Sequence, residues 1–395
     1  MANTLLTPSQ ITREALRVLH QKLNFIGAIN RQYDDSFAKD GAKIGSALRI
    51  RLPNQYTVRS GANLSAQDTT ENQVTLNVTS QKGVDTQFTS ADLTLSLDDF
   101  SQRIINPAMA VLAAAIEADA FSMALDVYNA VNNIGNVISF KNTLQARKIL
   151  NDNLAPMDGS RSIILNTQDN VDLVDALKGL FQDSSEIKAQ YRDGVMGHTA
   201  GFEFSENTLL PTQTTGTALS ATTYTVNGAN QTGSAVTVAT GSTTFKKGDI
   251  VTLAGCFRVH PETKTVLGDL QQFVVTADYA GGGGNLAISP AIVTSGGTQN
   301  VSASPTNGGA VTKVGGASAV YKPSLAFHKD AFTFATADLV LPKGVDMASR
   351  AVMDGISMRL VRQYDINYDR FPVRLDVLYG YQTLRAQLAC RILSN

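Results

Sequence analysis

The sequence predicts an α+β fold with an all-β barrel domain inserted into it, and three observations support this. Residues 43–96 alternate between apolar and polar side chains, as strands do. A stretch rich in Ala, Leu and Met, from Pro107 to Val131, predicts one long helix. Residues 212–320 differ in composition, because nine of these 109 residues are charged, against 58 of the other 286. We therefore expect a framework of helices and sheets that a Thr- and Gly-rich β-module interrupts.

Residues 1–40 predict a helix on an arm. The segment Thr7-Pro8-Ser9-Gln10 has the form of a capping box, with Pro8 at the first helical position. Apolar side chains follow at helical spacing: Ile11, Ala15, Leu19 and Leu23. The polar, weakly patterned segment after this helix offers it no partner close in sequence.

The alternating region predicts a long hairpin-like excursion. Two alternating segments, ALRIRLPNQYTVRSG and QVTLNVTSQKGVDTQFTSADLTLS, flank the polar stretch ANLSAQDTTEN. A lone two-stranded hairpin is only marginally stable in water. We therefore expect the excursion to lie on another surface, such as that of another subunit.

The remaining segments predict an α/β layer, the β-module and closing strands. Between residues 140 and 211, helices are expected at TLQARKILNDNLAP and NVDLVDALKGLF, and strands at SRSIILNT and AGFEFSENTLLP. In the module, six short segments alternate with turns, as in small barrels or sandwiches. They are TTYTVNG, SAVTVAT, GDIVTLAG, LQQFVVTADY, NLAISPAI and AVTKV. The region after Gly355 predicts two or three strands with turns near Asn367 and Gly380.

The overall composition argues against several classes of protein. The formal net charge is −1, with 33 basic and 34 acidic residues, so no excess charge points to nucleic acid or to an anionic membrane. The two cysteines are far apart, which does not suggest a disulfide framework. The N-terminus lacks the pattern of a secretory signal. The most apolar run, AMAVLAAAIEADAFSMALDV, is interrupted by acidic residues, and we expect no membrane span.

The stretch GCFRVHPETK brings three reactive side chains together in sequence: Cys256, His260 and Glu262. Even spacing would place all three on one face of a strand, but Pro261 interrupts that geometry. Zinc sites use four ligands, or three and a water, and no Cys-x-x-Cys or His-x-x-x-His pattern supports one here. We expect instead a half-buried cysteine at the end of a strand, followed by a polar turn.

Two further segments are weak candidates for enzyme chemistry. His328, Lys329 and Asp330 are adjacent, and adjacent residues of a strand point to opposite faces. The segment YAGGGGNL lacks the Lys and the following helix of a phosphate-binding loop, so a hairpin tip is expected. We expect no enzyme activity, no cofactor and no metal site.

The order of the segments resembles the major capsid proteins of tailed bacteriophages, which have the Hong Kong 97 (HK97) fold. Within that group the chain is similar to the phage P22-type coat proteins. Five stretches carry this resemblance. They are LRVLHQKLNFIGAINRQYDDSFAKDGAKIGSALRIRLP, SQKGVDTQFTSADLTLSLDDFSQRIINPA, AGFEFSENTLLP, LAFHKDAFTFATADL and FPVRLDVLYGYQTLRAQLACRI.

The resemblance implies five regions in an HK97-type capsid fold. Residues 1–40 would form the N-terminal arm and residues 41–80 the extended loop that lies over a neighbour. A peripheral domain around the spine helix would use 81–140 and 361–395, and an axial domain 141–211 and 321–360. Residues 212–320 would be the inserted β-barrel domain.

The resemblance also implies partners and places. The protein would self-assemble into pentamers and hexamers on a scaffolding protein, with a portal protein and weak, non-specific contact to packaged double-stranded DNA. Decoration proteins would be further partners, and no membrane is expected. The protein would reside in the virion shell and, during assembly, in the host cytoplasm.

Charged residues of the loop and of the module are the candidates for inter-subunit contacts. They are Arg49, Arg51, Arg59, Asp68, Glu71, Lys246, Lys247 and Asp249. Two alternatives stay open at this point. The Thr/Gly-rich module favours a β-rich receptor- or glycan-binding phage protein, and His328 or His260 would serve a hydrolase.

Overall fold

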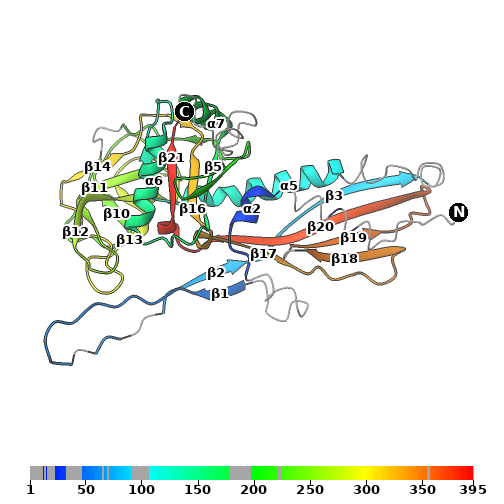
Figure 1. Cartoon of the computed structure of the whole chain (residues 1–395), viewed down its shortest axis with the longest axis horizontal. Coiled ribbons are helices and arrows are strands. Elements are labelled where there is room, and N and C mark those ends of the chain that lie inside the picture. Colours follow the sequence, from blue (N-terminus) through cyan, green and yellow to red (C-terminus); the bar gives the residue numbers. More distant parts are fainter. Residues whose placement is uncertain are drawn as a thin grey trace, which may run out of the picture. The chain divides into compact units, whose positions relative to one another are not determined.

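The computed structural model describes residues 12, 15, 23–32, 47–64, 66–68, 71–89, 106–177, 197–219, 224–353 and 356–394. The chain forms two compact units (Figure 1). The first comprises Met1–Ile50, Gln73–Phe121 and Phe332–Leu384, and the second Arg51–Asn72, Ser122–Ala331 and Arg385–Asn395. The predicted arm helix lies outside the described residues, apart from Thr12, Ala15 and Leu23.

The first unit is organised around β20 (Arg370–Thr383), a strand of 14 residues. On one side β20 pairs with β3 (Ser80–Thr89) over ten consecutive residue pairs. On the other side it pairs first with β19 (Ile356–Arg362) and then with β17 (Phe332–Ala337), all antiparallel. A hairpin joins β19 to the edge strand β18 (Met347–Met353). The predicted turn near Asn367 is confirmed, because it connects β19 to β20.

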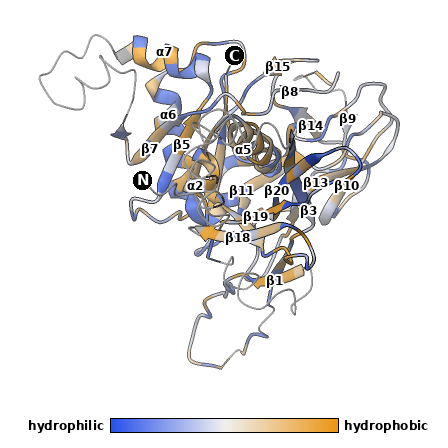
Figure 2. Ribbon diagram, turned by 90° about the vertical axis from the view of Figure 1, so that its right-hand side faces the viewer, coloured by the Kyte–Doolittle hydropathy of each residue, from blue (hydrophilic) through white to orange (hydrophobic). Residues whose placement is uncertain are grey.

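Helix α5 (Asn106–Phe121) lies along β3 (Figure 1). Figure 2 colours its ribbon mainly as hydrophobic. Its buried side chains recur at helical spacing: Met109, Leu112, Ala113, Ile116 and Ala120. At its end Phe121 stacks on Phe25 of the short helix α2 (Asn24–Ala28), with ring centroids 4.5 Å apart.

The spine helix is shorter than the predicted Pro107–Val131. It gives way to a 3₁₀ turn at Ser122–Asp126, and Ala130–Asn132 form strand β4 instead. One helical segment of the described chain resembles a membrane span in its sequence. By length and composition Pro107–Asp126 would pass as one, although 56% of the window is buried in the protein, as in the core helix of a globular fold.

Gly380 lies inside β20 and not in the predicted turn. A Cβ atom at this position would lie 2.1 Å from the carbonyl oxygen of Asn77, the last residue of β2 (Gln73–Asn77). A glycine inside a strand often marks such a close approach of another backbone. β2 pairs with β1 (Ala47–Arg51), and Ile50, Leu76 and Val78 are buried against Ala335.

The second unit contains a six-stranded mixed sheet in the order β4-β21-β16-β5-β7-β6. The strands beyond β4 are β5 (Arg161–Leu165), β6 (His198–Thr199), β7 (Phe202–Glu206), β16 (Ser324–His328) and β21 (Ala389–Leu393). Helix α6 (Phe140–Asp152) begins with a capping box of Ser139 and Asn142. Helix α7 (Thr167–Leu177) follows β5. The predicted α/β layer is therefore present.

Six strands between residues 224 and 313 form a second sheet, and each matches a predicted segment. Their order is β10-β13-β12-β11-β14-β9. Their bounds are β9 (Tyr224–Thr225), β10 (Gly233–Val238), β11 (Ile250–Val259), β12 (Val266–Val275), β13 (Gly284–Ile292) and β14 (Ala310–Lys313). The outer strands are also joined, because Val226 bridges Val238 and the Ala239 amide donates to the Thr225 carbonyl over 2.8 Å.

The chain enters and leaves this second sheet through two short strands that pair with each other. They are β8 (Gln213–Thr214) and β15 (Val320–Tyr321). The module has its own buried core, which includes Tyr224, Phe273 and Leu286. It is continuous with the α/β layer at this junction and also packs against it, because Ile250 of β11 is buried together with Ala130 and Leu393.

Replacing Gly380 by Ala should destabilise the first unit. The new Cβ would collide with the Asn77 carbonyl, and overpacking of this kind costs about 1–3 kcal/mol. Thermal or denaturant unfolding measures the change. Gly27→Ala is the control, because Gly27 lies in the same unit and its added Cβ would meet no atom within 4 Å. Equal stability of the two variants would contradict the close approach.

Candidate functional site

The three reactive side chains of GCFRVHPETK do not form a site. Cys256 lies within β11, not at its end, and belongs to the buried core of the module. Burial raises the pKa of its thiol to about 12, so the thiol is not poised as a nucleophile or metal ligand. His260 stabilises a turn, since its Nδ1 accepts from the backbone amides of Glu262 and Thr263 at 3.2 Å. The predicted polar turn is confirmed, and the cysteine is more deeply buried than expected.

His328 is a structural residue at the end of β16. Its ring is buried, its Nε2 lies 3.1 Å from Asp158 Oδ1, and its Nδ1 lies 3.7 Å from Asp330 Oδ2. The backbone amide of Ser160 and His328 lower the pKa of Asp158 to about 2. The flanking Phe327 and Phe332 are buried. The cluster therefore fastens the loop around residue 158 to the sheet.

The glycine run of YAGGGGNL forms the connection between β12 and β13. Gly281 and Gly282 have φ angles of +100° and +93°, which side chains with a Cβ rarely adopt. The Tyr279 hydroxyl donates to the Gly282 carbonyl over 2.8 Å. This is the expected hairpin tip. Within the described part of the chain, no group of three or more His, Cys, Asp or Glu residues is arranged to hold a metal ion.

The charged candidates of β1 and of the loop that follows it are exposed. Arg51 and Glu71 face each other across the hairpin, with 3.3 Å between Nη1 and Oε2. Arg59 folds back on the loop and donates to the carbonyls of Gly61 and Asn63. Arg49 and Asp68 are exposed. An exposed ion pair contributes little to stability, so these side chains remain available for other contacts.

Lys246 and Lys247 lie in the turn before β11. Lys246 Nζ lies 2.8 Å from Asp278 Oδ2, and Lys247 Nζ lies 3.9 Å from Asp126 Oδ1. Both lysine side chains are about half exposed, at 52% and 53%. Charged side chains that are paired and accessible can still meet another chain.

Asp249 must be removed from the contact candidates. Its side chain is fully buried, and its Oδ2 accepts from the backbone amides of Gly216 and Lys246 at 2.9 Å. Burial raises the pKa of its carboxyl group. It therefore ties the strand that enters the module to the start of β11 and offers no surface to another subunit.

A buried ion network in the first unit was not predicted from the sequence. Asp376 of β20 has a fully buried side chain and lies 2.7 Å from Arg359 Nη2 and 2.7 Å from Arg374 Nε. Arg359 also donates to the Val340 carbonyl over 2.7 Å. Gly83 of β3 is opposite Asp376, and a Cβ there would lie 2.6 Å from Asp376 Oδ1. In the sequence, the one sign of this network is Gly83, which interrupts a segment of alternating apolar and polar residues.

A second network joins α5 to the sheet. Asp119 of α5 accepts from the Tyr379 hydroxyl over 2.6 Å and lies 2.8 Å from Lys82 Nζ. Lys82 belongs to β3 and Tyr379 to β20, so one carboxylate connects the helix to two strands. Burial and the neighbouring Asp119 carboxylate both raise the pKa of the Tyr379 phenol, which stays protonated and donates.

A match to a protein-family model shows the family to which this chain belongs. A family model described as P22 coat protein, gene protein 5, matches residues 38–391. The chain belongs to this family. It is a major capsid protein, which self-associates to form the shell of a phage head and resides in the virion. The role of such a coat protein is structural, and the receptor- or glycan-binding alternative gives way to it.

Solved structures similar to this coat protein include phage capsids. One from Mycobacterium phage Che8 is 14% identical and covers 92% of this chain and 89% of its own, with a TM-score of 0.48. The capsid of cyanophage P-SCSP1u is 9% identical, covers 89% and 84%, and has a TM-score of 0.44. The mature capsid of bacteriophage PhiM1 is 10% identical, covers 89% and 83%, and has a TM-score of 0.44. No curated protein sequence matches the chain.

In this coat protein the two ion networks join the strands and the helix of the first unit. Asp376→Ala should therefore destabilise the first unit by about 3–5 kcal/mol, because it leaves the largely buried Arg359 without its carboxylate. Denaturant unfolding measures the loss. Asp85→Ala is the control, since this exposed carboxylate lies 4.0 Å from Arg374. A loss as small as that of the control would refute the role of Asp376.

The coat protein should also lose stability in acid through Asp158. Its pKa falls from an ordinary 3.8 to about 2 in the folded protein. The stabilisation is therefore complete above the unfolded-state pKa and is lost as the pH falls through about 2. Asp158→Asn should flatten the dependence of unfolding free energy on pH between about 5 and 2. An unchanged slope in that variant would show that the contacts of Asp158 with the Ser160 amide and with His328 have no effect on folding.

Proposed function

We propose that this coat protein has the HK97-type fold and builds its shell from pentamers and hexamers around a scaffolding protein. In this proposal the loop of residues 52–72, between β1 and β2, lies over a neighbouring subunit. The observation that carries it is the exposure of large apolar side chains on that loop. Tyr56, Val58 and Leu64 are 55%, 94% and 88% exposed.

The hydrogen bonds of the loop support an assembly role. Gln67 accepts from the Thr57 amide over 2.9 Å, and Arg59 donates to the Asn63 carbonyl over 2.9 Å, so these contacts join the loop to itself. Closely spaced exposed apolar side chains are characteristic of interaction surfaces. The backbone of Gln55 also approaches Gly297 closely, which anchors the base of the loop in the second unit.

The five regions follow from the same proposal. Residues 1–40 act as the arm, 41–80 as the extended loop, 81–140 and 361–395 as the peripheral domain, and 141–211 and 321–360 as the axial domain. Residues 212–320 act as the inserted barrel. Its support is the six-stranded order together with the bridge from Val226 to Val238, which joins the two outer strands.

The remaining partners are proposed on general grounds. A portal protein, decoration proteins and packaged DNA would each meet part of the shell. A formal net charge of −1 fits a lining that holds the genome only weakly. Assembly would take place in the host cytoplasm. Arg49, Arg51, Arg59, Asp68, Glu71, Lys246 and Lys247 remain the charged contact candidates.

A short deletion tests the loop. Replacing residues 53–71 by Asn-Gly would join Leu52 to Asn72, whose backbones are already hydrogen-bonded at 2.8 Å, through a two-residue hairpin turn. Ile50, Leu76 and Val78 stay in place, so the chain should fold with an unfolding temperature close to that of the parent. Co-expressed with the scaffolding protein, it should form no shells in negative-stain images or sedimentation.

Two point variants refine this test. Val58→Ser with Leu64→Ser should lower shell yield, whereas Val340→Ser, which alters a 72% exposed side chain outside the loop, should not. Shells at parental yield from the deletion would rule out the proposed contact. Unfolding of the deletion variant would show that the loop belongs to the core.

A further inference from the structure

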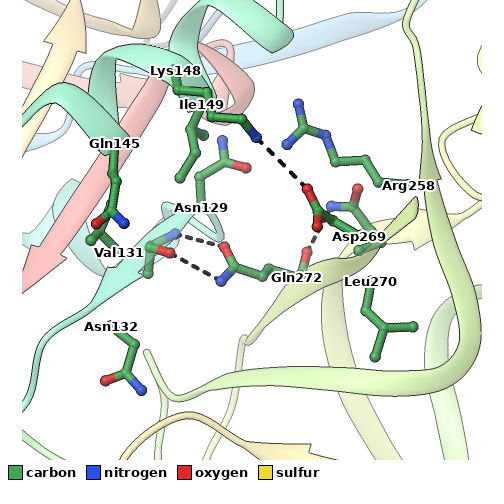
Figure 3. Close-up of a pocket in the computed structure, with 12 residues that line it drawn as sticks. Asn129, Val131, Asn132, Gln145, Lys148, Ile149, Arg258, Asp269, Leu270 and Gln272 are labelled. Atoms are coloured by element: carbon green, nitrogen blue, oxygen red, sulfur yellow. Dashed lines mark hydrogen bonds and ion pairs between the residues drawn. The ribbon is translucent and has the colours of Figure 1, made fainter. Parts of the chain in front are cut away.

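A polar cavity of about 400 Å³ lies in the second unit where α6, β4, β11 and β12 meet (Figure 3). Gln272 of β12 fixes one wall, since its Oε1 accepts from the Ala130 amide over 2.7 Å and its Nε2 donates to the Ala130 carbonyl over 3.0 Å. This amide pairs with the backbone of β4 as a neighbouring strand would. The cavity therefore has a wall that is held in place without a ligand.

Arg258 of β11 lines this cavity, and one nitrogen of its guanidinium group lacks an acceptor. Its side chain is only 12% exposed, and its Nη2 is buried without a hydrogen-bond partner among the described residues. The closest carboxylate oxygen, Oδ2 of Asp152, is 3.7 Å away, too far for a hydrogen bond. A buried charged donor left unpaired is costly, and such groups in native proteins are normally satisfied by something.

Lys148 of α6 brings a second positive charge to the same place. Its Nζ lies 3.2 Å from Asp152 Oδ2 and 3.8 Å from Asp269 Oδ2. Figure 3 shows the ends of Lys148 and Arg258 directed toward the same part of the cavity, with Asp269 beside them. Asp269 is 71% exposed, so it can leave this position at little cost.

We propose that this cavity binds a small oxyanion, a phosphate or carboxylate group, between Arg258 and Lys148. A guanidinium presents two parallel N–H groups that match two oxygens of such an anion. The ammonium of Lys148 supplies a mobile point charge from the opposite wall. The anion takes the place of the exposed Asp269 carboxylate and gives the Arg258 Nη2 its missing acceptor.

Binding would connect two parts of the second unit. Arg258 belongs to the sheet of residues 224–313, whereas Lys148 belongs to the helix that packs on the other sheet. An anion held by both side chains braces the module against the α/β layer. The inference does not depend on the loop contact proposed above, because it involves none of the loop residues.

Thermal unfolding of the full-length, unassembled chain tests the site. Inorganic phosphate is added to a phosphate-free buffer whose ionic strength is held constant with sodium chloride, and sodium acetate is added in a second series. At ten times its Kd, phosphate should raise the Tm by roughly 2 °C. If acetate also raises the Tm, the site accepts carboxylates as well as phosphate. If phosphate alone raises the Tm, the site is specific for phosphate.

Matched variants distinguish anion binding at this site from a general effect of salt on the Tm. Arg258→Gln and Lys148→Gln should each abolish the rise in Tm, and Arg258→Lys should weaken it. Lys141→Gln, on the same helix but outside the cavity, should leave it intact. Because Lys148 is 64% exposed, its variant should fold even if Arg258→Gln does not. No rise in the parent protein, or an equal rise in Lys148→Gln, would overturn the proposal.

Discussion

The first unit of this coat protein depends on the hydrogen-bond ladders of one strand. β20 pairs with β3 on one side and with β19 and β17 on the other, so three strands take their register from it. That register explains why two positions are occupied by glycine. Gly83 leaves room for the Asp376 carboxylate, and Gly380 leaves room for the Asn77 carbonyl. A one-residue slip would place Asp376 beside a side chain and remove it from Arg359.

Charged side chains join structural elements inside this protein, as well as being exposed on its surface. Asp376, Asp119 and Asp249 each join elements that are distant in sequence, and each accepts hydrogen bonds from more than one donor. A buried ion pair rarely adds much stability over apolar packing, but removal of one partner is costly. The networks therefore favour one arrangement over others. The exposed charges of residues 49–71 are paired only locally and remain free to meet other chains.

The sequence predicted elements better than it predicted tertiary contacts. The six strands of the module and both helices of the α/β layer follow from period and turn residues, which are local signals. The end of α5 at Phe121 could not be predicted, because the residues before Ala130 have high helix propensity. Ala130–Asn132 nevertheless form β4, because they pair with β21. Asp249 was predicted to lie on the surface because no local signal in the sequence indicates its burial. Its burial depends on Gly216, which is 33 positions away.

The module and the α/β layer are joined by interactions that no single segment provides. β21 lies between β4 and β16, so residues near 130, 326 and 391 must meet before this sheet is complete. Arg391 of β21 is fully buried and donates through Nη2 to the Gly248 carbonyl over 2.9 Å, next to Asp249 at the start of β11. Contacts of such high sequence separation form slowly, because the intervening chain must first be ordered. Insertion of β21 and docking of the module are therefore coupled, since the Gly248 carbonyl of the module is the acceptor of Arg391 Nη2.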